Sequence, residues 1–516
     1  MVSRCSAGLG EKTADRALGT ADRQGGEAMT SIEVPQSTGL PTVHSELQRN
    51  ALGLPGVLMQ GIATISPAFS QLGTFTATVA LAAIVSPLAF VIGGAVLAIQ
   101  ALCTAQLARE FPSAGGWYTW IARTVHPRAG FYAGWIFSIW LPPAGVLTLC
   151  YLGKAVLQPG IQAYYGVTIP WWVYPIVGIA LVAFWSYRGI KVSERLLLIT
   201  GGVEILIMVA LAITGLVHPG KGGFSFAPLN PGNFGKAPDV FLAIVFAVFA
   251  YSGWESIGPL AEESRNPRRY VPYALVGAVI ILMVFEFLAT WGFMVGIGVD
   301  RLHYITTAVA WPVATMAQHV WEGAWVILLL ALMNSALAVS LGSFNGATRT
   351  WFGMGRSGVL PKALGRVSPS RRTPVNAIHL ELVICGLAFL LAAVFGVDTV
   401  FFTWAIAITL ALIIMYIICD SGVIKYYLTA GRDRFNPVLH LILPIVSIVA
   451  VGYVGYKSIV PLPPPPEKWA PVVLGVYFVL GAAVLVYLKV RGNEEWLVRA
   501  QMAMEEDPQT PASPAL

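Results

Sequence analysis

The chain has 516 residues, of which 56% are hydrophobic and only 11% are charged, whereas an average soluble domain is about a quarter charged. The 32 Lys and Arg residues exceed the 26 Asp and Glu residues by six, so the composition excludes a disordered polyelectrolyte. No charged residue stands between Arg49 and Arg109, a gap of 59 residues that fits two membrane spans of about 20 residues each. The composition therefore predicts an integral protein of the lipid bilayer.

Residues 1–50 are polar and are predicted to form a disordered cytoplasmic tail. Twelve apolar segments follow, and each is long enough to span a bilayer. They lie at about 51–72, 78–107, 129–157, 170–187, 193–217, 239–260, 271–298, 323–350, 374–395, 399–419, 437–459 and 469–488. Unbroken apolar stretches of this length favour helices over the alternating pattern of a barrel, and the polar breaks, such as 111–127, are predicted to be loops.

The basic residues predict the orientation. If the segments alternate from a cytoplasmic N-terminus, 26 Lys and Arg residues fall on the cytoplasmic side and six on the other. Both termini, including a tail at 489–516, are therefore predicted to be cytoplasmic. The basic residues sit in separate short loops, so the net charge needs no nucleic-acid partner.

Two spans are interrupted in the same way. The first contains Gly61-Ile-Ala-Thr-Ile-Ser-Pro67, and the sixth contains Phe249-Ala-Tyr-Ser-Gly-Trp-Glu-Ser256 followed by Gly258-Pro259. Pro removes a backbone donor and Gly weakens a helix, so each span is expected to unwind near the middle of the membrane. One break alone is ordinary in a membrane helix, but two matched breaks five spans apart indicate the substrate site of an inverted-repeat transporter.

The sixth span also carries a family resemblance. The segments 249–255 and 261–272 are similar to the sixth-helix signature, and to the loop after it, of the amino acid-polyamine-organocation (APC) superfamily of permeases. Supporting segments stand at Glu110–Tyr118, Asn345–Arg349 and Gly358–Pro361. The chain thus resembles an amino acid permease of that superfamily from about Gly53 to Pro361, with later spans consistent in number.

The resemblance implies an all-α integral membrane fold with 12 transmembrane helices. Its core would be a 5+5 inverted repeat with broken helices one and six, plus two extra helices. On that plan, residues 51–217 form the first repeat, 239–419 the inverted second repeat and 437–488 the extra helices.

In relatives, a substrate ammonium meets carbonyls of unwound helix six and a substrate carboxylate meets amides of helix one. The positions carried over are Ala63, Thr64, Ile65 and Ser66 in helix one, and Phe249, Ser252 and Gly253 in helix six. Where the family commonly has a Gly-Ser-Gly-like triplet, Ile65-Ser66-Pro67 keeps only the serine, and Pro67 has no N–H for a carboxylate. An amine or choline-like substrate therefore stays open beside an amino acid.

Four acidic residues inside predicted spans stand out as functional candidates, because ionisable groups are costly in a membrane. Glu204, in the middle of helix five, is predicted to carry the coupling, with a proton favoured over sodium; the resemblance contributes here, because relatives that do not use sodium often have Lys at this place. Glu255, just after the helix-six break, is predicted to be a gate or network residue. For Glu286 and Glu381 we expect structural pairing or an aqueous face.

No cofactor and no metal site are predicted, because the Cys and His residues lack metal-ligand spacing and there is no Walker motif. The predicted function is a secondary active transporter, not an enzyme, that moves an amino acid or related small amine across the plasma membrane by alternating access. The alternatives are an amine, choline, polyamine or sodium-coupled carrier and, as a second class, a gated channel. An integral membrane enzyme would need a catalytic cluster that the sequence lacks.

The count of basic residues predicts that the loop 262–270 faces the cytoplasm. In a variant without native cysteines, Asn266→Cys should resist a membrane-impermeant maleimide added to sealed cells, because the label cannot cross the bilayer. Lys457→Cys, on the predicted outer side, should react under the same conditions. Labelling at position 266 from outside would overturn the orientation.

Overall fold

The computed structural model describes residues 47–307, 312–463 and 465–501. Within these ranges the regular elements are all helices, and the one β-type contact is an isolated bridge between Leu52 and Ser264. Ten helical stretches there are long and apolar enough to cross a membrane, which supports an all-helical, multi-pass membrane protein. The twelve spans and the inverted repeat stay predictions, since the first of the ten stretches, Leu54–Glu110, contains three helices and Val173–Arg188 is shorter than the rest.

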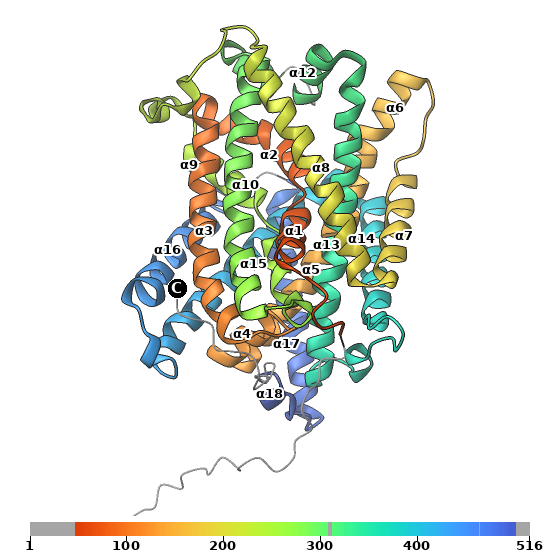
Figure 1. The fold of residues 1–516 in the computed structure, drawn as a ribbon, viewed down its shortest axis with the longest axis vertical. Coiled ribbons are helices and arrows are strands. Elements are labelled where there is room, and N and C mark those ends of the chain that lie inside the picture. Colours follow the sequence, from red (N-terminus) through yellow and green to blue (C-terminus); the bar gives the residue numbers. More distant parts are fainter. Residues whose placement is uncertain (1–46, 308–311, 464, 502–516) are drawn as a thin grey trace, which may run out of the picture. The chain divides into compact units, whose positions relative to one another are not determined.

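The helices are joined by connections of very different length, the longest running from Val217 to Val240 (Figure 1). In chain order they are α1 (Leu54–Ile65), α2 (Pro67–Ala82), α3 (Ser86–Glu110), α4 (Trp117–Thr124), α5 (Pro127–Leu152), α6 (Gln158–Tyr165), α7 (Val173–Arg188), α8 (Ile190–Val217), α9 (Val240–Ala250), the 3-10 helix η5 (Trp254–Glu263), α10 (Pro267–Ile297), α11 (Leu302–Thr307), α12 (Pro312–Trp321), α13 (Val326–Ser357), α14 (Val375–Phe395), α15 (Val397–Leu428), α16 (Leu443–Lys457), α17 (Ala470–Val490) and α18 (Trp496–Arg499).

Successive long helices run in alternate directions, so their connections gather at two ends. The α4 end, at the bottom of Figure 1, holds α4, α18 and the connection between η5 and α10. The α12 end, at the top, holds α6 and α12, and by the same alternation the connection between α16 and α17.

The first predicted boundary is wrong. The apolar segment predicted to end at residue 72 continues as α2 to Ala82. Within α2 the Thr74 hydroxyl donates to the Ser70 carbonyl at 2.9 Å, and the glycine beside Thr74 is tolerated in the helix. The chain turns at Ala83, with φ of 49°, and the next helix begins with Pro87 in its first turn, where proline is favoured.

Several short helices lie outside the predicted spans, and two of them are α4 and α12. The segment 111–127, predicted to be a loop, contains α4, whose Trp117 and Trp120 are fully buried at i, i+3 spacing. The second, α12, lies between the predicted spans 271–298 and 323–350. Both are shorter than the window that identifies a span, so hydropathy alone missed them.

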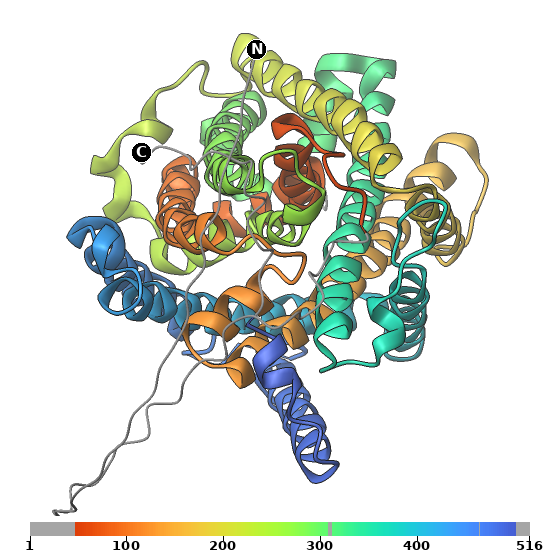
Figure 2. The ribbon, with the colours of Figure 1, turned by 60° about the horizontal axis from the view of Figure 1, so that its bottom comes forward.

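Large aromatic side chains concentrate in the interior near the α4 end, where Trp117 of α4 contacts both Trp120 of the same helix and Trp254 of η5. The outer helices instead expose aliphatic side chains, as Leu206 of α8 does. Figure 2 shows α17 at the periphery, standing outside the other helices. Exposed apolar faces are expected of helices whose solvent is lipid.

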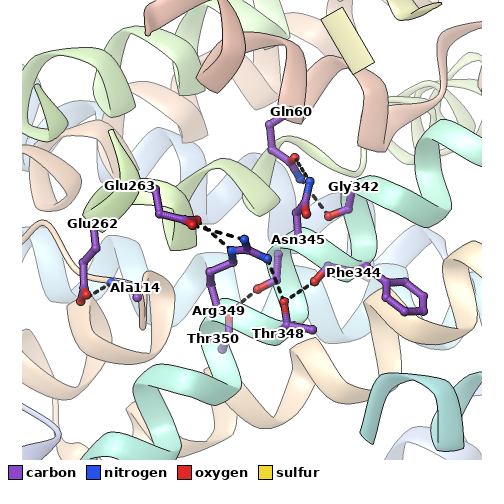
Figure 3. Close-up of polar contacts among 11 residues, drawn as sticks. Gln60, Ala114, Glu262, Glu263, Gly342, Phe344, Asn345, Thr348, Arg349 and Thr350 are labelled. Carbon is purple, nitrogen blue, oxygen red and sulfur yellow. Dashed lines mark hydrogen bonds and ion pairs between the residues drawn. The ribbon is translucent and has the colours of Figure 1, made fainter. Parts of the chain in front are cut away.

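Two carboxylates at the end of η5 pair with arginines of α13. Figure 3 shows one of these pairs, between Glu263 and Arg349. Arg349 donates from Nε to Glu263 at 2.8 Å and from a second nitrogen at 3.3 Å, and both side chains are at least 97% buried. Glu262 pairs with Arg356 and also accepts the Ala114 N–H at 2.9 Å. The α4 end is therefore closed by charged groups that satisfy one another.

Breaking the buried pair should be costly. Arg349→Ala leaves Glu263 as an uncompensated buried charge, so we expect a loss of about 3–5 kcal/mol in the free energy of unfolding. Arg128→Ala removes an exposed partner of Glu494 and should cost less than about 1 kcal/mol. Denaturation of the purified variants in detergent measures both. Equal losses would contradict the buried pair's role.

Candidate functional site

Helix one breaks at Ser66. α1 ends at Ile65, Ser66 takes a left-handed conformation with φ of 64°, and α2 restarts at Pro67, which has no N–H to continue the ladder. The Ser66 N–H turns back to the carbonyls of Ile62 and Ala63 at 3.2 and 3.1 Å. The backbone donor at the break is thus satisfied within helix one.

Helix six breaks between Ala250, the last residue of α9, and Trp254, the first of η5. Gly253 has a φ of 143°, and a Cβ added there would lie 2.6 Å from the nitrogen of Ile65 and 2.7 Å from the carbonyl carbon of Thr64. Only glycine permits this conformation and this approach. The two breaks therefore lie in direct backbone contact.

A cavity of about 510 Å³ begins at these breaks and extends to the exposed loop 460–463 at the α12 end. Five of the seven predicted binding residues line it: Thr64, Ile65, Ser66, Phe249 and Ser252. Ala63 is buried inside α1 and Gly253 packs on helix one, and neither belongs to the lining. Their contact with substrate stays a prediction.

Aromatic rings form much of the cavity wall, and they were not among the binding residues predicted from the sequence. Phe69 of α2 meets Tyr151 of α5 edge-on at 6.2 Å, and Tyr151 stacks on Phe401 of α15 at 4.6 Å between ring centroids. The sequence signal was present, since Phe401-Phe-Thr-Trp404 opens a predicted span. The charged lining residues lie toward the α12 end: Asp239, Lys457 and Glu467.

Beneath the cavity, hydroxyl and amide groups tie helix one to η5 and α13. Thr64 accepts a hydrogen bond from Ser256 at 2.9 Å and donates to the Gln60 carbonyl at 2.6 Å. The Gln60 amide donates to the Gly342 carbonyl at 2.8 Å and accepts from Asn345 at 3.1 Å (Figure 3). Every one of these groups is buried, so they hold the breaks in one arrangement.

Glu255 lies below the cavity and outside its lining. Its carboxylate accepts the Gly253 N–H at 2.8 Å and the hydroxyl proton of Tyr416. The Tyr416 ring stacks on Trp254 with centroids 5.9 Å apart, and Trp117 packs against both rings. Glu255 thus joins the helix-six break to an aromatic floor made of Trp117, Trp254 and Tyr416.

Glu204 of α8 reaches the helix-one break from the side. One carboxylate oxygen accepts from the Ala68 N–H at 2.9 Å and from the Ser335 hydroxyl at 2.6 Å, and the other accepts from Asn334 at 2.7 Å. Glu204 is fully buried and is absent from the cavity lining. Three donors converge on it, an arrangement that suits a negative charge at the N-terminus of α2.

The first amides of α2 are all engaged. Pro67 has none, Ala68 donates to Glu204, Phe69 donates to the Ser335 hydroxyl at 3.1 Å, and Ser70 donates to the Ser66 carbonyl at 2.8 Å. A helix N-terminus is otherwise a ready anion site. Here the chain's own carboxylate fills it.

The expectation for Glu286 and Glu381 was wrong. Both carboxyls are fully buried, and none of their four oxygens has a hydrogen-bond partner, so neither is structurally paired nor on an aqueous face. The position of a residue along a predicted span does not indicate which neighbouring helix covers it. In the structure, α10 and α14 turn Glu286 and Glu381 toward the interior.

Gly253 offers a test of the contact between the breaks. Gly253→Ala adds about 1–3 kcal/mol of backbone strain and drives a methyl group into the helix-one backbone, so uptake should be lost through displacement of the breaks. Gly386→Ala, where nothing lies within 4 Å of the added methyl, should transport normally. Transport by the Gly253 variant at the unmodified rate would show that the breaks need not touch.

Comparison with known proteins places the chain in a family. Residues 57–484 match the family described as amino acid permease. The low-affinity putrescine importer PlaP of Escherichia coli (strain K12) is 25% identical over 418 residues, which cover 78% of this chain and 87% of the relative. The branched-chain amino acid permease BcaP of Lactococcus lactis subsp. cremoris (strain MG1363) is 23% identical over 414 residues, 77% of this chain and 85% of the relative.

A third similar protein, the uncharacterized transporter Rv1999c of Mycobacterium tuberculosis (strain ATCC 25618 / H37Rv), is 27% identical over 436 residues, 79% of this chain and 89% of the relative. The family match spans most of the sequence and includes both broken helices. This chain therefore belongs to the amino acid permease family of the APC superfamily.

Proposed function

We propose that this permease is a proton-coupled secondary active transporter that moves a small amine-bearing solute across the plasma membrane by alternating access. The observation that carries the proposal is the cavity, which starts at two broken helices in contact and extends to one end only. A carrier needs such a one-sided site, whereas a channel needs a continuous polar path. On the predicted orientation, the cavity faces the outside.

The other end is closed in layers. The aromatic floor lies directly below the breaks, and the buried pair of Arg349 and Glu263 lies beyond it toward the α4 end. The floor residues Trp117 and Trp254 are fully buried, which supports a seal on this side of the cavity. In the proposed cycle this seal opens when the outer cavity closes.

The recognised group is proposed to be the substrate ammonium. Ser252 and Phe249 line the cavity at the helix-six break, where a hydroxyl oxygen and a ring face can meet a cation. A substrate carboxylate has no free amide at the start of α2, because Glu204 and Ser335 already engage those groups. This favours amines such as putrescine, which the name of one relative specifies, over a standard amino acid.

An amino acid is the second candidate, because another relative is named a branched-chain amino acid permease. The aromatic wall provides apolar surface for an aliphatic side chain. Its carboxylate would need Ser335 or Glu204 to turn away from α2. The two candidates therefore differ in whether binding disturbs Glu204.

Glu204 is proposed to carry the proton. A proton on its carboxyl can be donated to the Ser335 hydroxyl, which must then stop donating to Glu204 and can donate to Ser66 instead. The Ser66 and Ser335 hydroxyls are 2.7 Å apart, and Ser66 lines the cavity. Protonation of Glu204 thus changes the hydrogen bonds of Ser66, which lies at the proposed substrate site.

Proteoliposome uptake of radiolabelled putrescine and leucine tests the function and the coupling together. The wild-type protein should concentrate one of them when the side facing the cavity is acidified. Glu204→Gln keeps the acceptor for Ala68 but cannot titrate, so we expect it to retain exchange and to lose accumulation driven by the pH gradient.

The exchange assay is the internal control, because counterflow needs binding and alternation but no net proton movement. The new amide nitrogen would face the Asn334 amide, which also donates to the Thr200 carbonyl at 3.2 Å, so a moderate loss of thermal stability is expected. Accumulation by the Gln variant under an imposed proton gradient would move the coupling away from Glu204. Absence of any saturable flux in the wild type would reject the carrier itself.

A further inference from the structure

Behind the cavity wall, three buried side-chain oxygens have no hydrogen-bond partner. Two are the carboxylate oxygens of Glu286 in α10, and the third is the amide oxygen of Gln71 in α2. Both side chains are fully buried. Buried polar atoms are almost always satisfied, so unpartnered oxygens on facing helices require an explanation.

The two side chains are brought together by one contact between α2 and α10. The Gln71 amide nitrogen donates to the Thr290 hydroxyl at 2.9 Å, and Thr290 stands one helical turn after Glu286 on the same face. One turn further, the rings of Phe75 and Phe293 continue the contact with centroids 5.9 Å apart. The amide of Gln71 therefore lies within a helical turn of the Glu286 carboxyl.

The helix-six break supplies a third side. Tyr251 is close enough to interact electrostatically with Glu286, but its hydroxyl proton goes to the Phe90 carbonyl at 2.9 Å. Within the part of the chain that the structure describes, no hydrogen-bond donor, charged or neutral, reaches the Glu286 carboxyl.

An ionised carboxylate in that position is strongly unfavourable unless a cation accompanies it. Oxygen atoms from carboxylate and amide groups are the ligands that hard cations prefer. We propose that Glu286 and Gln71 bind a small monovalent cation, Na⁺ or a proton, at a site separate from Glu204. The inference deepens the proposed transport function, because it supplies a second cation site in the same carrier.

The position of the proposed site links the cation to the two broken helices. Gln71 follows Ser70, which lines the substrate cavity, and it belongs to the helix that starts at the helix-one break. Tyr251 lies within the helix-six break. A cation held at Glu286 therefore connects α10 to both broken helices, and its release loosens that connection.

Glu381 provides a matched control. The two carboxylate oxygens of Glu381 are also buried and unpartnered. Glu381 lies in α14 close to Cys385, and α14 packs with α5, α13 and α15 instead of the broken helices. Glu381→Gln makes the same chemical change as Glu286→Gln without touching α2. An effect shared by both variants reflects a buried carboxyl in general.

The test is thermal unfolding of purified full-length protein in detergent, with no substrate present. In the first arm, NaCl replaces KCl at constant ionic strength and pH. If Na⁺ is the cation, the wild type and Glu381→Gln should show a saturable rise in Tm, and Glu286→Gln should lose that rise entirely. In the second arm, pH varies in KCl. If the proton is the cation, Glu286→Gln should lose more of the stabilisation found at low pH than Glu381→Gln, whose carboxyl is equally buried.

Gln71→Leu is an independent test, because it removes the Gln71 amide oxygen and keeps the Glu286 carboxyl. This variant should show a smaller change in Tm in whichever arm depends on Glu286. If purified Glu286→Gln is not monodisperse, the change in Tm of Gln71→Leu alone tests the cation site. Responses identical to wild type in both arms overturn the proposal. Neither arm measures flux. The proposal of a cation site can therefore be rejected while the proposed transport function is supported, and the transport function can be rejected while the cation site is supported.

Discussion

The structure depends on how two interrupted helices satisfy their backbone inside a low-dielectric interior. A break exposes amides that water cannot reach in a bilayer, so each must find a partner within the protein. Two carboxylates do this: Glu204 accepts from Ala68 at the start of α2, and Glu255 accepts from Gly253 at the start of η5. Both breaks can then lie in contact because Gly253 has no side chain.

This solution shapes the cavity. Since the acids at the breaks turn away from the cavity, its inner part is lined by hydroxyls, backbone and rings, and its charged residues stand toward the α12 end. On the proposed function, such a wall would bind the substrate cation through ring faces and carbonyls without fixing it by a buried ion pair. Binding of that kind is weak enough to reverse in each proposed transport cycle, and a full counter-charge at the breaks would hinder release.

Much of this could be predicted from the sequence. Apolar length revealed the membrane spans, and the matched Gly and Pro residues located both breaks, because these signals are local. The aromatic wall and α4 were missed, since they depend on which faces meet after folding. For the same reason the sequence misjudged Glu286, whose unpartnered carboxyl depends on its packing beside α2. The partner of Glu204 was also nonlocal, since Ser335 lies 131 residues away.

The floor and the breaks are linked through one side chain. Glu255 holds the Gly253 amide with one oxygen and Tyr416 with the other, so η5 cannot tilt without disturbing either the break or the floor. Gly253 in turn rests on the backbone of helix one, so a solute that shifts helix one displaces the same residue. Packed interiors respond to such shifts by switching between discrete arrangements rather than by bending. A solute bound at the breaks can therefore act on a seal that it does not touch, which is the coupling that alternating access requires.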